Sequence, residues 1–165
     1  MLQLYLLSRE PFTQSQGRSL LPSSPGPATF QSNMICNRGT LMERLLLVEH
    51  NLLFREGLAL LLEWRTGLSS IHAGTLAAAK GVLEEADRKP ACIIVDLDLP
   101  EGDGTELLEQ LDGTPVLALS RSLNLERQAE ALGLGADEVL QTGSVEKIAA
   151  AVERLIGTWC APLGA

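Results

Sequence analysis

Short apolar runs alternate with segments of helical periodicity between residues 42 and 157. The run over 45–48 is apolar at every position, which is typical of a strand buried on both faces of a sheet. Runs of this kind predict β-α units, joined by right-handed crossovers into a parallel sheet with helices on both faces. The sequence therefore predicts a doubly wound α/β domain with five strands, expected at 45–48, 70–73, 92–95, 115–119 and 138–140.

Five amphipathic segments predict the helices that join these strands. Their apolar residues recur with a helical period, which gives each helix one face to bury. Residues that favour helix starts precede four of them, and a glycine offers a stop to the first. The expected inward-facing stripes lie within 54–62, 76–83, 107–111, 125–132 and 145–156, and the expected caps are Asn51, Thr75, Thr105 and Ser144, with Gly67 as the stop.

The N-terminal quarter of the chain has a different composition. Residues 8–41 are rich in Ser, Pro, Gly, Gln and Asn, which bury too little apolar surface to offset the entropy of an ordered chain. We expect a disordered arm over 1–41, a folded domain over 42–157 and a short tail over 158–165. A start codon assigned too early would also account for the arm, with Met34 and Met42 as the alternative starts.

Acidic residues outnumber basic ones, with 21 Asp and Glu against 13 Lys and Arg, a net charge of −8 and a pI of 4.7. Such a surface is unsuited to neutralising phosphates, and the short tail leaves no room for a helix-turn-helix, so we expect no direct DNA binding.

The cysteines and the N-terminus bear on location. Three widely spaced cysteines predict neither a disulfide framework nor paired metal ligands, which favours the reducing cytoplasm. The apolar run MLQLYLL is too short to span a bilayer and lacks the charged start of a secretion signal. We therefore expect a cytoplasmic protein without a membrane segment.

Polar side chains follow the ends of four of the predicted strands. The carboxyl ends of parallel strands meet at one rim, where open α/β sheets bind their ligands. Carboxylates, a hydroxyl and an arginine are therefore expected to converge there. The residues at this rim are Glu49, His50, Asp96, Ser120, Arg121, Gln141 and Thr142.

Three parts of the chain resemble the receiver domain of bacterial response regulators. LLLVEHNLLFREGLALLLE is similar to the first strand and helix of that family. PACIIVDLDLPEGDGTELL is similar to its third strand and phosphorylation loop, and PVLALS and ALGLGADEVL to its fourth strand and the approach to its fifth. The resemblance implies a flavodoxin-like strand order of 2-1-3-4-5.

The resemblance implies that Asp96 is the phosphoacceptor. Glu49, Asp96 and the backbone carbonyl of Asp98 fall at the positions of the family's ligands for Mg²⁺. His50 stands where the family has a second acidic residue, and imidazole is a poor ligand for Mg²⁺. We therefore expect weak or absent Mg²⁺ binding.

Other positions of the implied site also depart from the family. Ser120 matches the hydroxyl residue that bonds the phosphoryl group. Thr142 stands where the family has a lysine, and Val139 where it has an aromatic residue. Arg121 occupies a place usually given to a small residue, and its guanidinium offers a substitute charge. These departures predict a degenerate receiver, with Asp96 a weak phosphoacceptor.

The resemblance implies a signalling role in a two-component phosphorelay and no enzymatic activity. We expect a stand-alone receiver whose partners are a histidine kinase or phosphotransfer protein and a downstream protein. The implied partner surface, also the surface for a homodimer, is formed by the fourth helix, the fifth strand and the last helix. It includes Leu123, Leu125, Val139 and Val145.

Two other functions stay open. VDLDLP also resembles the motif of haloacid-dehalogenase-type phosphatases, with Asp96 attacking and Asp98 as acid/base, but a later lysine and paired acids are not evident after Asp103. A doubly wound domain can also bind a small molecule or nucleotide, but no glycine-rich turn follows the first strand. The simplest structural roles are turn formation for Asp98 and Asp103 and core packing for Cys92.

Overall fold

Five strands form one parallel sheet in the order β2-β1-β3-β6-β7, which confirms the predicted doubly wound fold. The computed structural model describes residues 44–86, 89–111, 113–122 and 124–159. The expected arm over 1–41 and residues 160–165 of the expected tail lie outside this part of the chain. The strands of the sheet are β1 (Leu45–Val48), β2 (Ser70–Ala73), β3 (Cys92–Asp96), β6 (Val116–Ser120) and β7 (Glu138–Gln141).

The central position of β1 explains its uninterrupted apolar sequence. Each of its four residues pairs in parallel with β2 on one side and β3 on the other. Successive side chains of a strand point to opposite faces of the sheet. Leu45 and Leu47 therefore enter one core and Leu46 and Val48 the other, and all four are buried.

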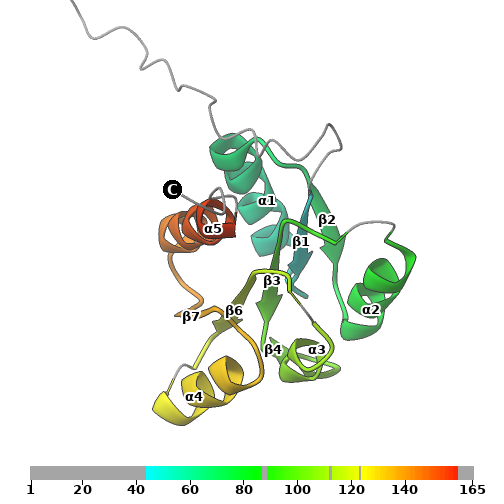
Figure 1. Ribbon diagram of the computed structural model, residues 1–165, viewed down its shortest axis with the longest axis vertical. Coiled ribbons are helices and arrows are strands. Elements are labelled where there is room, and N and C mark those ends of the chain that lie inside the picture. The colour runs from blue at the N-terminus through cyan, green and yellow to red at the C-terminus, as the bar shows by residue number, and fades with distance from the viewer. Residues whose placement is uncertain (1–43, 87–88, 112, 123, 160–165) are drawn as a thin grey trace, which may run out of the picture. The chain divides into compact units, whose positions relative to one another are not determined.

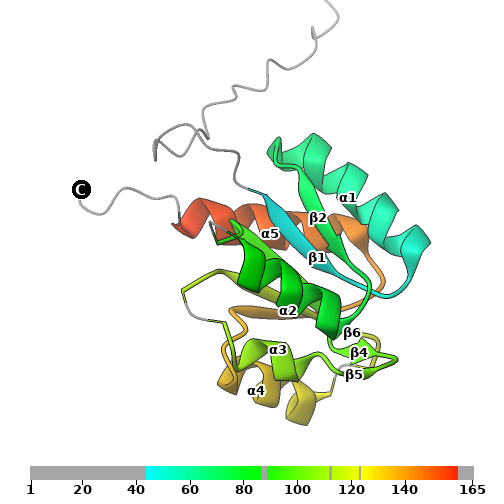
Figure 2. The same ribbon diagram turned by 90° about the vertical axis from the view of Figure 1, so that its right-hand side faces the viewer.

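Helices cover both faces of the sheet, with α1 and α5 on one face and α2, α3 and α4 on the other (Figures 1 and 2). Leu58 and Leu62 of α1 pack with Ile148 and Val152 of α5 against the first face. The helices are α1 (Leu52–Thr66), α2 (Leu76–Glu85), α3 (Thr105–Leu108), α4 (Leu125–Gly133) and α5 (Val145–Trp159).

Three of the predicted caps are confirmed. The side chains of Asn51, Thr75 and Ser144 each accept a hydrogen bond from a backbone N–H three residues later, at 3.1, 3.1 and 3.4 Å. Gly67 ends α1 with a φ of 72°, the left-handed conformation that glycine adopts without steric cost.

The segment after β3 differs from the prediction in three ways. The expected loop contains a two-stranded antiparallel ribbon, β4 (Asp98–Leu99) and β5 (Gly102–Asp103). Thr105 does not cap α3 but is its first residue, and its N–H donates to Oδ1 of Asp103 at 2.9 Å. The helix ends at Leu108 rather than reaching Leu111, because the N–H of Leu111 bonds to the carbonyl of Leu108 in a tighter turn.

Within the described residues, no helix combines the length and the apolar character needed to cross a membrane.

Candidate functional site

Strands β1 and β3 bring two acidic residues and a histidine together at the carboxyl rim of the sheet. Val48 pairs with Val95 in the register of these strands. Glu49 and His50, which follow β1, therefore lie beside Asp96, the last residue of β3. Glu49 and Asp96 are buried, with side-chain exposures of 7% and 2%, whereas the His50 side chain is 31% exposed.

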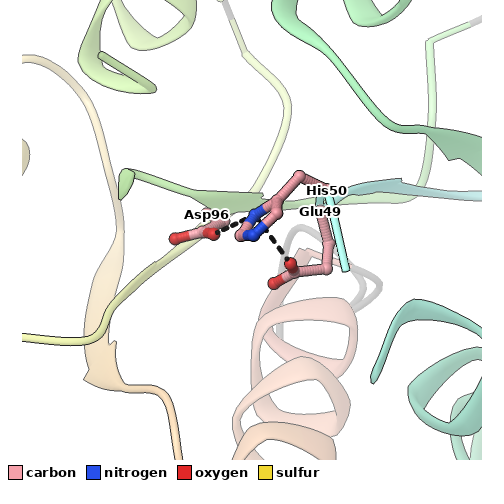
Figure 3. Close-up of side chains that lie close together, drawn as sticks. All are labelled: Glu49, His50 and Asp96. Atoms are coloured by element: carbon pink, nitrogen blue, oxygen red, sulfur yellow. Dashed lines mark ion pairs between the residues drawn. The ribbon is translucent and has the colours of Figure 1, made fainter. Parts of the chain in front are cut away.

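The imidazole of His50 lies between the two carboxylates (Figure 3). Its Nδ1 atom is 3.2 Å from Oε1 of Glu49 and 3.3 Å from Oδ2 of Asp96. This nitrogen is shielded from solvent and has no hydrogen-bond partner of suitable geometry within the described residues. The three side chains therefore share one small volume with two carboxylate oxygens directed at one nitrogen.

Local structure fixes the Glu49 side chain. Its Oε1 accepts a 2.7 Å hydrogen bond from the N–H of Asn51, the residue that caps α1. Burial raises the pKa of the Glu49 carboxyl, and the nearby Asp96 charge adds to this; the Asn51 bond and the charges of His50 and Arg121 act in the opposite direction. The carboxyl is thus held where its ionised form is costly unless a positive charge lies close by.

Asp98 links Asp96 to the end of β6 through hydrogen bonds. Its N–H donates to Oδ1 of Asp96 at 2.9 Å, so the Asp96 carboxylate is held by the loop that follows it. The Asp98 carboxylate accepts hydrogen bonds from the Ser120 hydroxyl at 3.1 Å and from the Arg121 N–H at 2.6 Å. The hydroxyl expected to bond a phosphoryl group is therefore engaged by Asp98.

Arg121 and Thr142, the two candidates for contacting a phosphoryl group after Ser120, make different contacts. The guanidinium of Arg121 donates to the backbone carbonyl of Asp98 at 2.7 Å, the oxygen that was expected to bind metal. Thr142 follows β7, and its N–H bonds to the carbonyl of Ser120 at 2.9 Å. Its Oγ1 is buried and makes no hydrogen bond within the described part of the chain.

A family model matches most of the described part of the chain. The family model described as "Response regulator receiver domain" matches residues 45–153, which span the sheet and nearly all of its helices. The chain belongs to this family. Receiver domains are signalling modules that in general are not enzymes, and they interact with kinases and downstream partners in two-component systems.

Curated relatives agree with this assignment. The KDP operon transcriptional regulatory protein KdpE of Escherichia coli K12 is 40% identical over 102 residues, 60% of this chain. The Regulator of RpoS of the same strain is 38% identical over 105 residues, 59% of this chain. The receiver spans only 44% and 29% of the lengths of these two relatives.

Solved structures share the fold. A CheY-like receiver domain protein from Methanospirillum hungatei superposes with a TM-score of 0.65 at 20% identity, covering 72% of this chain and 97% of that one. A response regulator from Burkholderia pseudomallei, described with a phosphorylated aspartic acid, calcium ion and citrate, has a TM-score of 0.60 at 26% identity. It covers 70% of this chain and 69% of its own.

Receiver domains generally bind Mg²⁺ at acidic residues, and in this chain the corresponding cluster contains a histidine beside Glu49 and Asp96. Mg²⁺ requires near-octahedral oxygen coordination. Here a nitrogen of His50 lies between the carboxylates, and the Asp98 carbonyl already accepts from the Arg121 guanidinium. One of the three clustered ligand groups is therefore an imidazole, which Mg²⁺ binds poorly.

The expected partner surface is only partly exposed. Leu125 at the start of α4 is 85% exposed, whereas Val139 of β7 is buried in the core and Val145 is half-buried. Leu123 lies outside the described residues. The accessible apolar part of this surface is therefore centred on α4.

An ion pair that the sequence pattern did not predict joins α4 to the loop over 97–104, called the acceptor loop after the role expected of Asp96. The guanidinium of Arg127 donates to both carboxylate oxygens of Asp103, at 2.6 and 2.8 Å, and to the carbonyl of Leu97 at 3.2 Å. A signal for it exists in the sequence. A cation in the first turn of a helix opposes the helix dipole, which indicates that a partner compensates it.

The paired guanidinium holds the pKa of Asp103 at about 2, well below its usual 3.8, and the pairing also raises the pKa of Arg127. A carboxyl whose pKa is lower in the folded protein than in the unfolded chain stabilises the fold at a pH above its pKa in the unfolded chain. This stabilisation is lost as the pH falls through the pKa of the carboxyl in the folded protein. The pair should therefore contribute fully above about pH 4 and progressively less towards about pH 2.

We expect Arg127→Ala to lower the free energy of unfolding by roughly 1 kcal/mol at about pH 7, since water screens the half-exposed Asp103. Urea titrations should show a smaller difference between native and variant protein at about pH 3. Lys80→Ala, which removes a 3.8 Å surface pair with Glu106, is the control and should cost less than about 0.5 kcal/mol. A difference for Arg127→Ala that does not change with pH would contradict this assignment.

Proposed function

We propose that this receiver transmits its signal by binding a downstream protein and that Asp96 is a weak phosphoacceptor. The observation that carries the proposal is the position of His50 Nδ1 between the carboxylates of Glu49 and Asp96. Asp96 ends β3 and is the buried carboxylate of the matched motif. In the Burkholderia regulator, an aspartic acid is described as phosphorylated.

Phosphorylation would join one oxygen of Asp96 to the phosphorus of a donor, whose leaving group departs with the electrons of the broken bond. The chain's own residues support this step poorly. Oδ1 of Asp96 accepts from the N–H of Asp98, and Oδ2 faces His50. Thr142 brings no charge to the phosphoryl oxygens, and charged hydrogen bonds are worth ~1.5 to 3 kcal/mol.

The partners we propose are a histidine kinase or phosphotransfer protein on the input side and a protein that contacts α4, β7 and α5 on the output side. Leu125, exposed on α4, offers an apolar contact for that protein or for a second copy. Arg127, two residues later, is tied to the acceptor loop through Asp103. The output surface and the acceptor loop are thus physically connected.

The proposal that the chain is no enzyme is supported by the contacts of Asp98. A phosphatase of the haloacid-dehalogenase type would use this carboxylate as acid/base. Here it accepts from the Ser120 hydroxyl and the Arg121 N–H.

The test is labelling of the native protein and Asp96→Asn with a small-molecule phosphodonor and Mg²⁺, followed by mass spectrometry of the intact proteins. We expect slow, incomplete labelling of the native protein and none of the variant, because the acceptor lacks its charged supports. Rapid, complete labelling at Asp96 would refute the proposed weakness of the acceptor. Labelling elsewhere would refute the assignment of Asp96.

A further inference from the structure

We infer that Glu49, His50 and Asp96 form a site for a zinc-class transition-metal ion instead of Mg²⁺. The mixed set of one imidazole nitrogen and two carboxylates is a donor set that Zn²⁺ accepts and Mg²⁺ does not favour. The inference concerns the resting site, and it does not depend on how fast Asp96 is phosphorylated.

The spacing of the donor atoms suits a four-coordinate ion. Bonds of about 2.0 to 2.2 Å from Zn²⁺ to nitrogen and oxygen put the ligand atoms of a tetrahedron roughly 3.3 to 3.5 Å apart. Nδ1 of His50 is 3.2 Å from Oε1 of Glu49 and 3.3 Å from Oδ2 of Asp96. One ligand atom from each residue lies within 4.8 Å of the others. Two edges of the tetrahedron are therefore nearly formed, and the third forms when the two carboxylate oxygens approach each other around the ion.

The surroundings of His50 Nδ1 also favour a bound cation. This atom is inaccessible to solvent and lacks a hydrogen-bond partner within the described residues, although it faces two carboxylate oxygens. The two carboxylate contacts do not have hydrogen-bond geometry, and a bound cation would satisfy the nitrogen and both oxygens together. A cluster of carboxylates alone would lack this feature.

Arg121 lowers the number of ligands that the protein can offer. Its guanidinium donates to the carbonyl of Asp98 at 2.7 Å and places a positive charge beside that oxygen, which disfavours a cation there. Three protein ligands remain, and zinc sites with three protein ligands keep the fourth position for water or another small ligand. The 31% exposure of the His50 side chain gives that position a route to solvent.

The test is a calorimetric titration of the full chain with Zn²⁺, with Cys36 and Cys160 replaced by serine. This background removes two other zinc ligands, whereas Cys92 can stay because burial raises the pKa of its thiol to about 12. We expect one Zn²⁺ per chain, retained in a large excess of Mg²⁺. Co²⁺ should give the strong visible absorption of a four-coordinate site.

Three variants assign the ligand. His50→Asn should lower Zn²⁺ affinity by more than about tenfold, because it removes the nitrogen ligand. His72→Asn is the matched control, since His72 is the other histidine of the chain and pairs with Glu56 at 3.1 Å. His50→Asp should reverse the preference, losing Zn²⁺ affinity and gaining Mg²⁺ affinity, a gain that a misfolded protein cannot produce.

Equal Zn²⁺ affinity of the native protein and His50→Asn would overturn the inference, as would displacement of Zn²⁺ by an equimolar amount of Mg²⁺. The phosphodonor labelling proposed above, run without Zn²⁺, measures phosphorylation of Asp96 independently of zinc binding. Fast labelling there would refute the weak acceptor and leave the metal titration unaffected. Failure of the zinc titration would leave the labelling result equally unaffected.

Discussion

Replacing His50 by aspartate and Thr142 by lysine together should raise the rate of Asp96 phosphorylation on the order of 100-fold, since a charged hydrogen bond contributes ~1.5 to 3 kcal/mol. The aspartate restores a carboxylate where Nδ1 of His50 now lies, which should also raise Mg²⁺ affinity. The lysine adds a charge near the phosphoryl oxygens. Phosphodonor labelling with parallel Mg²⁺ titration would measure both changes.

The single variants are the internal controls for this experiment. Both substitutions act on the same transition state, so their effects should be coupled, and either one alone should help little. Adding Asp96→Asn to the double variant should abolish the gain. If the native chain labels as fast as the double variant, the site is not degenerate, and another group such as Arg121 supplies the missing charge.

Gly104→Ala should lower the free energy of unfolding by about 2 to 3 kcal/mol, the cost of overpacking a site that cannot relax. A Cβ at this position would lie 2.7 Å from Cα of Leu97 and even closer to the carbonyl oxygen of Asp96. Both are backbone atoms, so the end of β3 would have to move. The backbone angles of Gly104 are ordinary helical ones, φ −58° and ψ −18°, so the requirement is space and not conformation.

Gly57→Ala in α1 is the matched control. A Cβ there meets nothing within 4 Å, and an exposed helical glycine costs about 0.5 to 1 kcal/mol relative to alanine. This variant should therefore be more stable than the native protein in urea titrations. If the free energy of unfolding of Gly104→Ala lies within about 0.5 kcal/mol of the native value, the backbone after Asp96 can move at little cost and the prediction is wrong.

The predictable part of the fold is the part with local signals. The apolar run of β1 and the capping side chain of Asn51 are each read from a few neighbouring residues, and the structure confirms both. The order of the strands followed from the family resemblance. The rim position of Glu49 beside Asp96 could also be predicted, because parallel strands end on the same side of the sheet.

The unpredicted part depends on contacts between distant residues. The ribbon of β4 and β5 is only two residues long on each side, too short for an alternating pattern to mark it. The Arg121 guanidinium bonds a carbonyl 23 residues earlier in the chain. A substitute charge was expected at Arg121, but the oxygen that it would engage depends on the folded loop, which the sequence pattern does not specify.

The link between Arg127 of α4 and Asp103 of the acceptor loop couples binding at α4 to binding at the acceptor loop. If a partner binds α4 only when the guanidinium leaves Asp103, its binding free energy includes the cost of breaking that pair. A ligand at the acceptor loop that releases Asp103 removes this cost beforehand. The factor by which the ligand tightens partner binding must equal the factor by which the partner tightens ligand binding. One ion pair would then set an upper limit on how strongly this route can couple input to output.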